Sequence, residues 1–435
     1  MTDTTIVSVR GRRVWDSRAR PTVEAEVALA DGALGRAIAP AGASTGTGEA
    51  IDLRDAGEAF GGLDVRKALG NVNGEIADAI RGQDALDQAS IDAALIGLDG
   101  TPNKARLGGN ALIAVSLATL KAAAASRGVG LWRHLAGDQP VRIPLPEIQI
   151  FGGGAHAARR VDIQDFMVVC PQAASFAEAL DRTAEVYRAA GAILKARGLL
   201  QGVADEGGFW PAFTSNDQAL DTLVLAIEQA GFRPGPEVAI SLDVAASEFH
   251  ENERYRLARD GRELDTDGMI AMLLGWIDRY PIVSIEDPLS EEDVAGFRAF
   301  TRAAGDRVQV IGDDFLVTNS GRVEMAAQTR ACTAVLVKPN QAGTVSETKA
   351  ALDAARRHGL GAIISARSGE TEDVTIAHLA VGWDAGQFKV GSIARGERTA
   401  KWNEVLRIEE ELGSQARFAG GDALRAAMMN GQKQQ

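Results

Sequence analysis

The chain has 435 residues, 46% of them hydrophobic and 24% charged, which is ordinary for a soluble globular protein. A chain of this length is more often two domains than one. The formal net charge of −13 and the lack of a Lys/Arg block argue against a nucleic-acid partner. An anionic substrate is still compatible with this charge, because a bound cation can reverse the local field.

The cysteines and the first residues indicate a cytoplasmic protein. Cys170 and Cys332 are the only cysteines and have no CxxC spacing, so neither a disulfide framework nor a thiolate zinc site is indicated. The start of the chain lacks the charged and apolar regions of a signal peptide, and no uninterrupted apolar run approaches membrane-span length. We therefore expect no membrane partner.

The N-terminal part begins with strands and continues with helices. Residues 5–38 alternate between apolar and polar side chains as strands do, with Asp31-Gly32 as a hairpin turn. Residues 39–50 are mostly Gly, Ala, Ser and Thr, and they form either a lid that closes over a ligand or a plain connector. From residue 65 to 135 the apolar spacing is helical.

The helical pattern breaks at Pro140 and again at Pro144 and Pro146, and we place a domain boundary there. The sequence thus predicts an N-terminal α+β domain, residues 1–138, and a second domain, residues 139–435. The second domain alternates short apolar runs with helical segments, which is typical of an α/β barrel.

Five of these apolar runs end on a charged side chain. They are residues 238–243, 281–286, 308–313, 334–338 and 361–367, which end on Asp243, Glu286, Asp313, Lys338 and Arg367. Short, aliphatic, β-branched runs indicate strands that are buried on both faces of a parallel sheet. Active sites of (β/α) barrels lie at the C-terminal ends of the strands, so we expect the five charged residues to converge on one pocket.

Three consecutive strand ends carry carboxylates. Asp243, Glu286 and Asp313 offer oxygen ligands without Cys or His, which suits a hard cation such as Mg²⁺ that keeps positions open for water and substrate. The alternative for any one of them is a cap on the following helix. We interpret their neighbours Asp287 and Asp314 as supports for the metal ligands.

Basic groups follow the carboxylates. Lys338, held partly neutral by burial and by nearby positive charge, is a candidate general base; the alternative is a salt bridge to one of the same carboxylates. We expect Lys389 to lower the proton affinity of Lys338 or to bind an anion. Arg367 offers the paired N–H donors of its guanidinium, and Ser368 offers a hydroxyl, to a phosphate or carboxylate.

Two further residues indicate an acid on the opposite side. Glu206 lies in a tight turn before two glycines, where it has little room to be a solvated surface charge. His156 follows a glycine run, so we expect an exposed position, and a loop hydrogen bond is as good an explanation as catalysis. An acid facing a lysine base fits proton abstraction next to a metal-bound carboxylate, followed by loss of a leaving group.

With these residues in place, the chain resembles the enolase family of phosphopyruvate hydratases. The resemblance is carried by motifs spread along the chain: Asp16-Ser-Arg18, Gly42-Ala-Ser-Thr-Gly46, Gly100-Thr-Pro-Asn-Lys104, Asp205-Glu-Gly-Gly-Phe209, Ser284-Ile-Glu-Asp287, Gly312-Asp-Asp314 and Arg367-Ser-Gly-Glu-Thr-Glu-Asp373. It implies an α/β fold, namely a modified (β/α)8 TIM barrel with an N-terminal α+β capping domain. It also implies a homodimer.

The resemblance implies a role for each candidate residue. The residues implied for catalysis are Glu206, Lys338, Asp165 and His156. Those implied for substrate binding are Gln164, Arg367, Ser368 and Lys389. Those implied for two Mg²⁺ ions are Asp243, Glu286, Asp313 and, on the small-residue loop, Ser44. Lys338 would remove the C2 proton of the substrate, and Glu206 would protonate its departing 3-hydroxyl.

The chain departs from the family pattern on the leaving-group and substrate side. Ala366 stands where the family has His, and Asp165 stands where the family has Glu, a carboxylate one methylene longer. Gln149 and Gly152 each stand where the family has Asn. The metal and base positions are unchanged, so we expect enolate chemistry to be retained on the same or a related substrate.

Three hypotheses follow. The first is a Mg²⁺-dependent lyase that converts 2-phosphoglycerate to phosphoenolpyruvate. The second is the same dehydration of a substituted phospho- or phosphonoglycerate, in the manner of carboxyphosphonoenolpyruvate synthase, in space opened by Ala366. The third is a weakly active homologue that acts as a binding protein.

Overall fold

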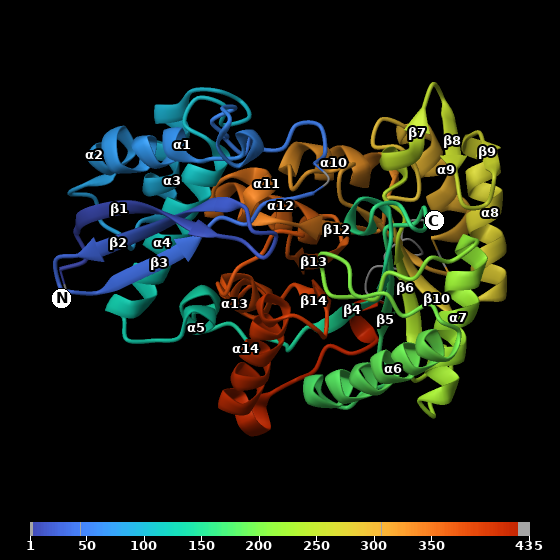
Figure 1. Ribbon diagram of the computed structural model, residues 1–435. Helices are drawn as coiled ribbons and strands as arrows, with labels where there is room; N and C mark the ends of the chain where they lie inside the picture. The colour runs from blue at the N-terminus through green and yellow to red at the C-terminus, as the bar shows by residue number, and fades with distance from the viewer. Residues whose placement is uncertain (1–2, 44, 306, 425–435) are drawn as a thin grey trace.

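The computed structural model describes residues 3–43, 45–305 and 307–424 (Figure 1). Its N-terminal part begins with a three-stranded antiparallel sheet, made of β1 (Ile6–Trp15), β2 (Pro21–Leu29) and β3 (Leu34–Ile38) in that order. The helices that follow are α1 (Arg66–Asn71), α2 (Ala77–Ile80), α3 (Gln88–Asp99), α4 (Gly109–Ser126) and α5 (Leu131–Ala136). The predicted order, strands first and helices after, is confirmed.

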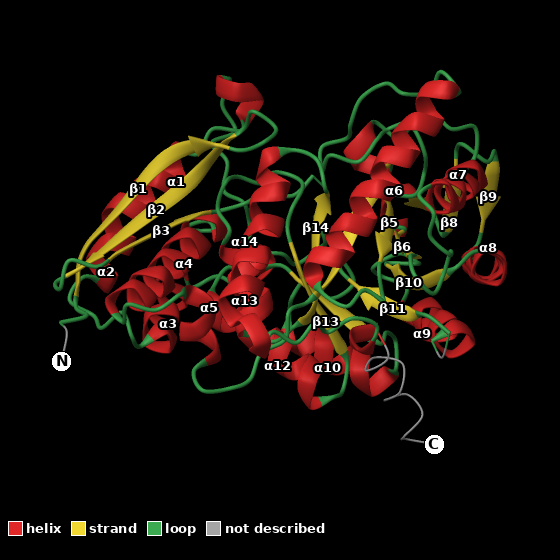
Figure 2. Cartoon of the chain, turned by 90° about the horizontal axis from the view of Figure 1, so that it is seen from below, coloured by secondary structure: helices red, strands yellow, loops and turns green. Residues whose placement is uncertain are grey.

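Helix α4 is the core of the N-terminal part and packs on β2 and β3 (Figure 2). Gly35 permits the close approach of β3, because a Cβ at this position would collide with the backbone of Ala118 and Ala122. By length and composition alone, α4 could cross a membrane. However, 83% of the helix is buried inside the protein, and this burial accounts for its apolar composition.

The second part of the chain is a closed eight-stranded barrel. Around the barrel the strands are β10 (Ile282–Glu286), β11 (Gln309–Gly312), β12 (Ala334–Val337), β13 (Gly361–Ser365), β14 (Gly386–Ser392), β4 (Leu145–Gly152), β5 (Asp165–Val169) and β6 (Ala239–Asp243). The helices are α6 (Phe176–Ala196), α7 (Asn216–Gln229), α8 (Thr266–Arg279), α9 (Val294–Ala304), α10 (Ser320–Thr329), α11 (Pro339–Ala342), α12 (Val345–Arg357), α13 (Thr375–Gly382) and α14 (Gly396–Leu412). A small sheet of β7 (His250–Glu251), β8 (Arg254–Leu257) and β9 (Arg262–Leu264) lies beside it.

The barrel strands form because their side chains are buried on both faces. In β12 all four residues are buried, with Ala334 and Leu336 in a small cluster of their own and Val335 and Val337 in the main core. The cluster therefore fills the barrel interior, while the main core lies between the strands and the surrounding helices. All five predicted runs are strands, which end on the predicted charged residue or one or two residues before it.

One strand runs in the opposite direction. Strand β5 is antiparallel to both of its neighbours, with Asp165 paired with Gly152 of β4 and with Asp243 of β6. Asp165 begins its strand but therefore lies at the rim where the other strands end. This reversal makes the barrel a modified (β/α)8 barrel, and with the N-terminal α+β part it confirms the predicted fold class.

Most long barrel helices begin at a side chain that accepts a backbone N–H. These N-cap residues are Ser175, Ser215, Asp265, Asp293, Asn319 and Thr344. The caps fix where each helix starts after its strand, and hence the length of each loop at the barrel rim.

Candidate active site

A polar pocket opens at the rim of the barrel, with about 330 Å³ of space that no atom fills. Nine predicted site residues line it: His156, Gln164, Asp165, Glu206, Asp243, Lys338, Arg367, Ser368 and Lys389. Glu286 and Asp313 lie buried beside the lining. Ser44 is outside the described residues, but its neighbours Gly42 and Ala43 line the pocket.

Each of the three predicted metal ligands contacts a lysine. The Nζ atom of Lys389 lies 2.9 Å from Asp243 Oδ2 and 2.9 Å from each carboxylate oxygen of Glu286. Lys338 donates to Asp313 Oδ2. Positive charge is thus already favoured where the three carboxylates meet, and their oxygen-only donor set fits a hard cation. Asp243 also accepts the Ala245 N–H at 3.1 Å, but the 3-10 turn that follows, Ala246–Phe249, has no side-chain cap, so the capping alternative does not describe this residue.

Asp287, Asp313 and Asp314 form a second group of buried carboxylates, which shares Asp313 with the first. Asp287 accepts the backbone N–H of Asp313 at 2.9 Å and that of Asp314 at 2.8 Å. Single carboxylate oxygens of these three residues all lie within 4.8 Å of one another, so this group could also hold a metal ion. Burial and then the charge of Asp313 raise the pKa of Asp314 to about 8. Asp287 fixes the backbone that presents Asp313, as expected of a support.

Lys338 is not held neutral here, and that expectation is wrong for this structure. Burial lowers the pKa of Lys338, but the adjacent Asp313 carboxylate outweighs burial, so the pKa is raised above its ordinary value. The salt-bridge alternative therefore describes the observed contact. Among nearby positive charges Arg367 lowers this pKa, whereas Lys389 lies against Asp243 and Glu286.

The acid side of the pocket is a buried trio of His156, Asp165 and Glu206. His156 Nδ1 lies 3.3 Å from Asp165 Oδ1, and His156 Nε2 lies 3.8 Å from Glu206 Oε1. Burial alone would lower the pKa of His156, but the charges of Glu206 and Asp165 raise it to about 9. This charge lowers the pKa of Asp165 to about 2 although burial opposes it.

The expectation that His156 is exposed is wrong. The 3-10 turn Gly154–Ala157 tucks its ring under the rim, where 7% of the residue is accessible. The glycine run allows this because a Cβ at Gly153 would collide with the backbone of Ile163 and one at Gly154 would lie 3.1 Å from Gln164 Cα. The glycines therefore serve close packing rather than loop freedom.

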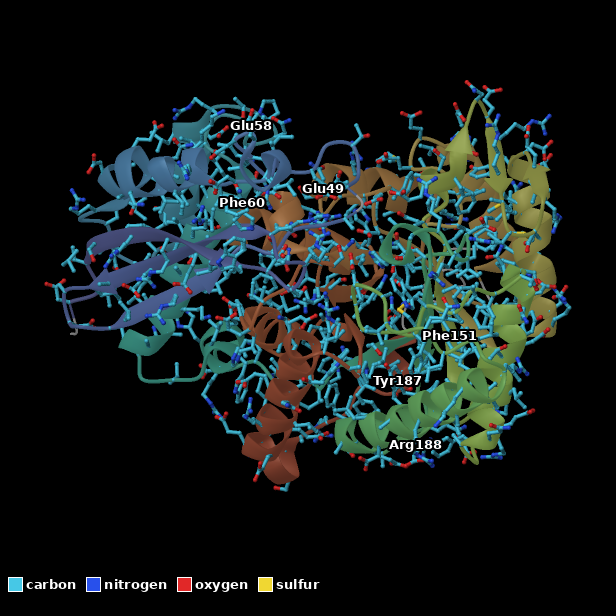
Figure 3. The ribbon with its side chains drawn as sticks, in the orientation of Figure 1. Glu49, Glu58, Phe60, Phe151, Tyr187 and Arg188 are labelled. Carbon is cyan, nitrogen blue, oxygen red and sulfur yellow. The ribbon has the colours of Figure 1, made fainter. Side chains whose placement is uncertain are left out.

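Arg367 joins the barrel to the loop of residues 39–50. Its guanidinium donates to both carboxylate oxygens of Glu49, at 2.9 Å and 3.2 Å, and Glu49 Oε1 accepts the Gly46 N–H at 3.0 Å. Figure 3 shows Glu49 between the N-terminal part and the barrel. The sequence analysis did not identify Glu49 as a site residue. The feature that could have identified it is that Glu49 is the sole charged residue of this loop.

Ser368 and Gln164 complete the predicted binding groups. Ser368 Oγ accepts from Arg18 Nη1 at 3.3 Å, and Arg18 also donates to the carbonyl of Ala41 at 2.8 Å. Gln164 Nε2 donates to Asp243 Oδ2 at 3.1 Å, and its Oε1 has no hydrogen-bond partner among the described residues. Buried, unpartnered polar atoms at a pocket are available to a ligand.

Gln149 is a second residue that sequence reasoning assigned no role. Its amide nitrogen donates to Asp165 Oδ1, and its amide oxygen accepts the Gly208 N–H at 2.8 Å. Gln149 could have been singled out from the sequence, because it is one of the positions at which the chain departs from the pattern of the family it resembles. Ala366, the clearest of these departures, lines the pocket beside Arg367 and supplies only a methyl group.

Comparison with known proteins identifies the family of the chain. Two family models match the chain: "Enolase, N-terminal domain" over residues 6–135 and "Enolase, C-terminal TIM barrel domain" over residues 140–427. The chain is also 48% identical over 425 residues to Enolase 1 of Desulfitobacterium hafniense (strain Y51), and the match covers 97% of each protein. The chain therefore belongs to the enolase family and is a lyase of the phosphopyruvate hydratase type.

Proposed function

We propose that the protein catalyses the Mg²⁺-dependent dehydration of 2-phosphoglycerate to phosphoenolpyruvate. The observation that carries this proposal is the placement of a lysine, Lys338, and an acid, Glu206, in one pocket beside the buried carboxylates of Asp243, Glu286 and Asp313. The enolase family membership of the chain supports the same reaction.

Asp243, Glu286 and Asp313 are the residues that would hold Mg²⁺, and Ser44 would contribute to a second ion. Bound there, Mg²⁺ would supply positive charge to stabilise the negative charge that develops on the substrate carboxylate. The lysine contacts at these carboxylates support a site that favours cations. With a cation bound, Lys389 would be free to pair with the substrate.

Lys338 takes the proton from C2 of the substrate. To accept a proton it must be neutral, and Asp313 is the group that raises its pKa. A cation held by Asp313 would offset the charge that raises this pKa, and Lys338 would then be a usable base.

Glu206 delivers a proton to the 3-hydroxyl group, so that water leaves and the C2–C3 double bond forms. The positively charged ring of His156 lies between the carboxylates of Asp165 and Glu206 and offsets their negative charge. Arg367, Ser368, Lys389 and Gln164 are the groups proposed to bind the phosphate and carboxylate of the substrate.

A second candidate substrate is favoured by one observation. Ala366 lines the pocket with a methyl group where the family motif has an imidazole, so substrate atoms have additional room there. A substituted phospho- or phosphonoglycerate would undergo the same proton abstraction and loss of water. The weakly active binding protein is disfavoured, because Lys338, Glu206 and Asp243 line one pocket and Glu286 and Asp313 are buried.

Further proposals follow from family membership. We propose a cytoplasmic homodimer whose subunits divide into residues 1–138 and 139–435, the boundary lying between α5 and β4. Size measurement in solution tests the homodimer, and limited proteolysis tests the domain boundary.

Exchange of the C2 proton tests the assignment of base and acid. Glu206→Gln should still exchange the C2 proton of 2-phosphoglycerate with deuterium from solvent, because Lys338 remains, but it should not release water. Lys338→Met should lose both exchange and dehydration. Exchange that survives in Lys338→Met would contradict the assignment of the base.

A further inference from the structure

Gln149 is buried behind the acid side of the pocket and uses both ends of its amide. It lies on β4 with no accessible surface. Its Nε2 donates to Asp165 Oδ1 at the start of β5, and its Oε1 accepts the Gly208 N–H at 2.8 Å. A single side chain therefore joins the carboxylate that faces His156 to the turn that carries Glu206.

The contacts around Gln149 form a closed circuit. From Gln149 they pass to Asp165, then from Asp165 Oδ1 to His156 Nδ1 at 3.3 Å, and from His156 Nε2 to Glu206 Oε1 at 3.8 Å. Glu206 and Gly208 belong to the same turn, so the circuit returns to the amide of Gln149. Any change in the reach of this amide must change where the His156 ring stands relative to Glu206.

The turn itself is anchored independently of Gln149. Tyr187 of α6, labelled in Figure 3, donates from its hydroxyl to the carbonyl of Gly207 at 2.9 Å. Phe209 N–H donates to the carbonyl of Ile150 at 2.9 Å, and the Phe209 ring stacks on Tyr187 with centroids 4.3 Å apart. The turn therefore stays in place when the amide changes, and Asp165 is the part that must move.

Little free space surrounds the amide. A Cβ added to Gly208 would lie 2.5 Å from Gln149 Oε1. A Cβ added to Gly152 would lie 2.6 Å from Ala204 Cβ and 3.3 Å from Gln149 Nε2. The amide is packed on two sides, so it cannot swing to a different partner without a backbone shift.

We propose that Gln149 is a positioning residue for the acid side of the active site, and that Gln149 and Asp165 compensate for each other in length. One hydrogen bond joins the Gln149 amide on β4 to the Asp165 carboxylate at the start of β5, so the two side chains together span a distance that the strands fix. Shortening the amide by one methylene and lengthening the carboxylate by one methylene should therefore preserve the contact, whereas either change alone should disturb it. The inference rests on the proposed function, since it concerns the geometry of the acid Glu206.

A double-mutant cycle with Gln149→Asn and Asp165→Glu tests the proposal. Each single variant should lower kcat about 10- to 100-fold, as changes to groups that orient a reacting residue commonly do. The KM of Gln149→Asn should stay within about threefold of the parent value, because Gln149 does not line the pocket. The double variant should recover most of the lost kcat. Parental kcat in Gln149→Asn, or losses that simply multiply in the double variant, would overturn the proposal.

Gln387→Asn combined with Asp165→Glu is the matched control. Gln387 is also a buried barrel glutamine, but its amide donates to Glu147 Oε1 at 2.6 Å and does not contact Asp165. This combination should show no recovery. Recovery equal to that of the Gln149→Asn pair would mean that the rescue is not specific to the circuit, and would also overturn the proposal.

A readout without turnover separates this inference from the proposed function. The His156 ring can be titrated by NMR in histidine-labelled protein, with His156→Gln used to assign its signal. The titration midpoint, expected at about 9 in the parent, should be displaced in both single variants and restored in the double variant. One midpoint shared by all four proteins would overturn the positioning role. Absence of any dehydration by the parent would overturn the proposed function alone.

Discussion

The ammonium nitrogen of Lys389 lies 2.9 Å from both carboxylate oxygens of Glu286, deep at the barrel rim. The same nitrogen is 2.9 Å from Asp243 Oδ2. Burial would lower the pKa of Lys389, but Asp243 and Glu286 outweigh burial and raise it well above its ordinary value. Lys389 and Lys338 therefore offset part of the negative charge of the three carboxylates Asp243, Glu286 and Asp313.

Removal of metal should abolish activity without unfolding the protein. In EDTA the carboxylates keep their contacts to Lys338 and Lys389, so unfolding should remain cooperative. Added Mg²⁺ should raise stability by about 2.7 kcal/mol at a hundredfold excess over its dissociation constant. Calorimetry and the dehydration assay in parallel samples measure both effects. A chain that unfolds at room temperature in EDTA would contradict this picture.

Lys389→Met should strongly destabilise the metal-free protein. It leaves Asp243 and Glu286 buried without their cation, which costs about 3 to 5 kcal/mol when one partner of a buried pair is removed. Lys349→Met is the control, since its pair with Asp353 is half-exposed on α12 and worth at most about 0.5 kcal/mol. Urea unfolding in EDTA compares the two variants. Equal losses would argue against a buried cation site.

The stability contributed by His156 should depend on pH. Its pKa in the folded protein is about 9, above the ordinary value of 6.5, because Glu206 and Asp165 outweigh burial. The charged ring therefore stabilises the fold fully below pH 6.5, and this contribution is lost as pH rises through 9. His156→Asn should thus be less stable than the parent at pH 6 by on the order of 3 kcal/mol, and the difference should shrink towards pH 10. A pH-independent difference in urea unfolding would contradict the assignment of charge.

Ala366→Val should change substrate preference. Its added methyl groups enter the pocket, so dehydration of a substituted phospho- or phosphonoglycerate should fall more than that of 2-phosphoglycerate. One methylene in a pocket is worth about 1 to 3 kcal/mol, or 10- to 200-fold. Ala362→Val, in strand β13 just before Ala366 but away from the pocket, should lower stability without changing the ratio of the two activities. The ratio of kcat/KM for the two substrates measures the effect, and an unchanged ratio in Ala366→Val would exclude this position from specificity.

Strand positions and rim residues could be predicted because a barrel strand buried on both faces leaves a clear apolar run. The apolar runs that end at Asp243, Glu286 and Asp313 predicted both the strands and the position of the carboxylates at the strand ends. The direction of β5 could not be read in this way, since an apolar run looks the same in both directions. Its reversal is nevertheless what brings Asp165 to the site.

Side-chain environments were less predictable than strand positions. The glycines before His156 suggested a free loop, whereas they permit close packing that buries the ring. The raised pKa of Lys338 depends on where Asp313 stands, which no sequence pattern specifies. Glu49 and Gln149 were missed because each acts through contacts with residues far along the chain or on another strand.

Steady-state dehydration of 2-phosphoglycerate, followed by the ultraviolet absorbance of the enol product with Mg²⁺ and with EDTA, tests the central claim most directly. The account predicts Mg²⁺-dependent turnover at ordinary enzyme rates, about 1 to 10³ per second, and none with EDTA. Turnover that persists in EDTA would contradict the role assigned to Asp243, Glu286 and Asp313. Mg²⁺-dependent turnover that is weaker by several orders of magnitude would contradict 2-phosphoglycerate as the natural substrate.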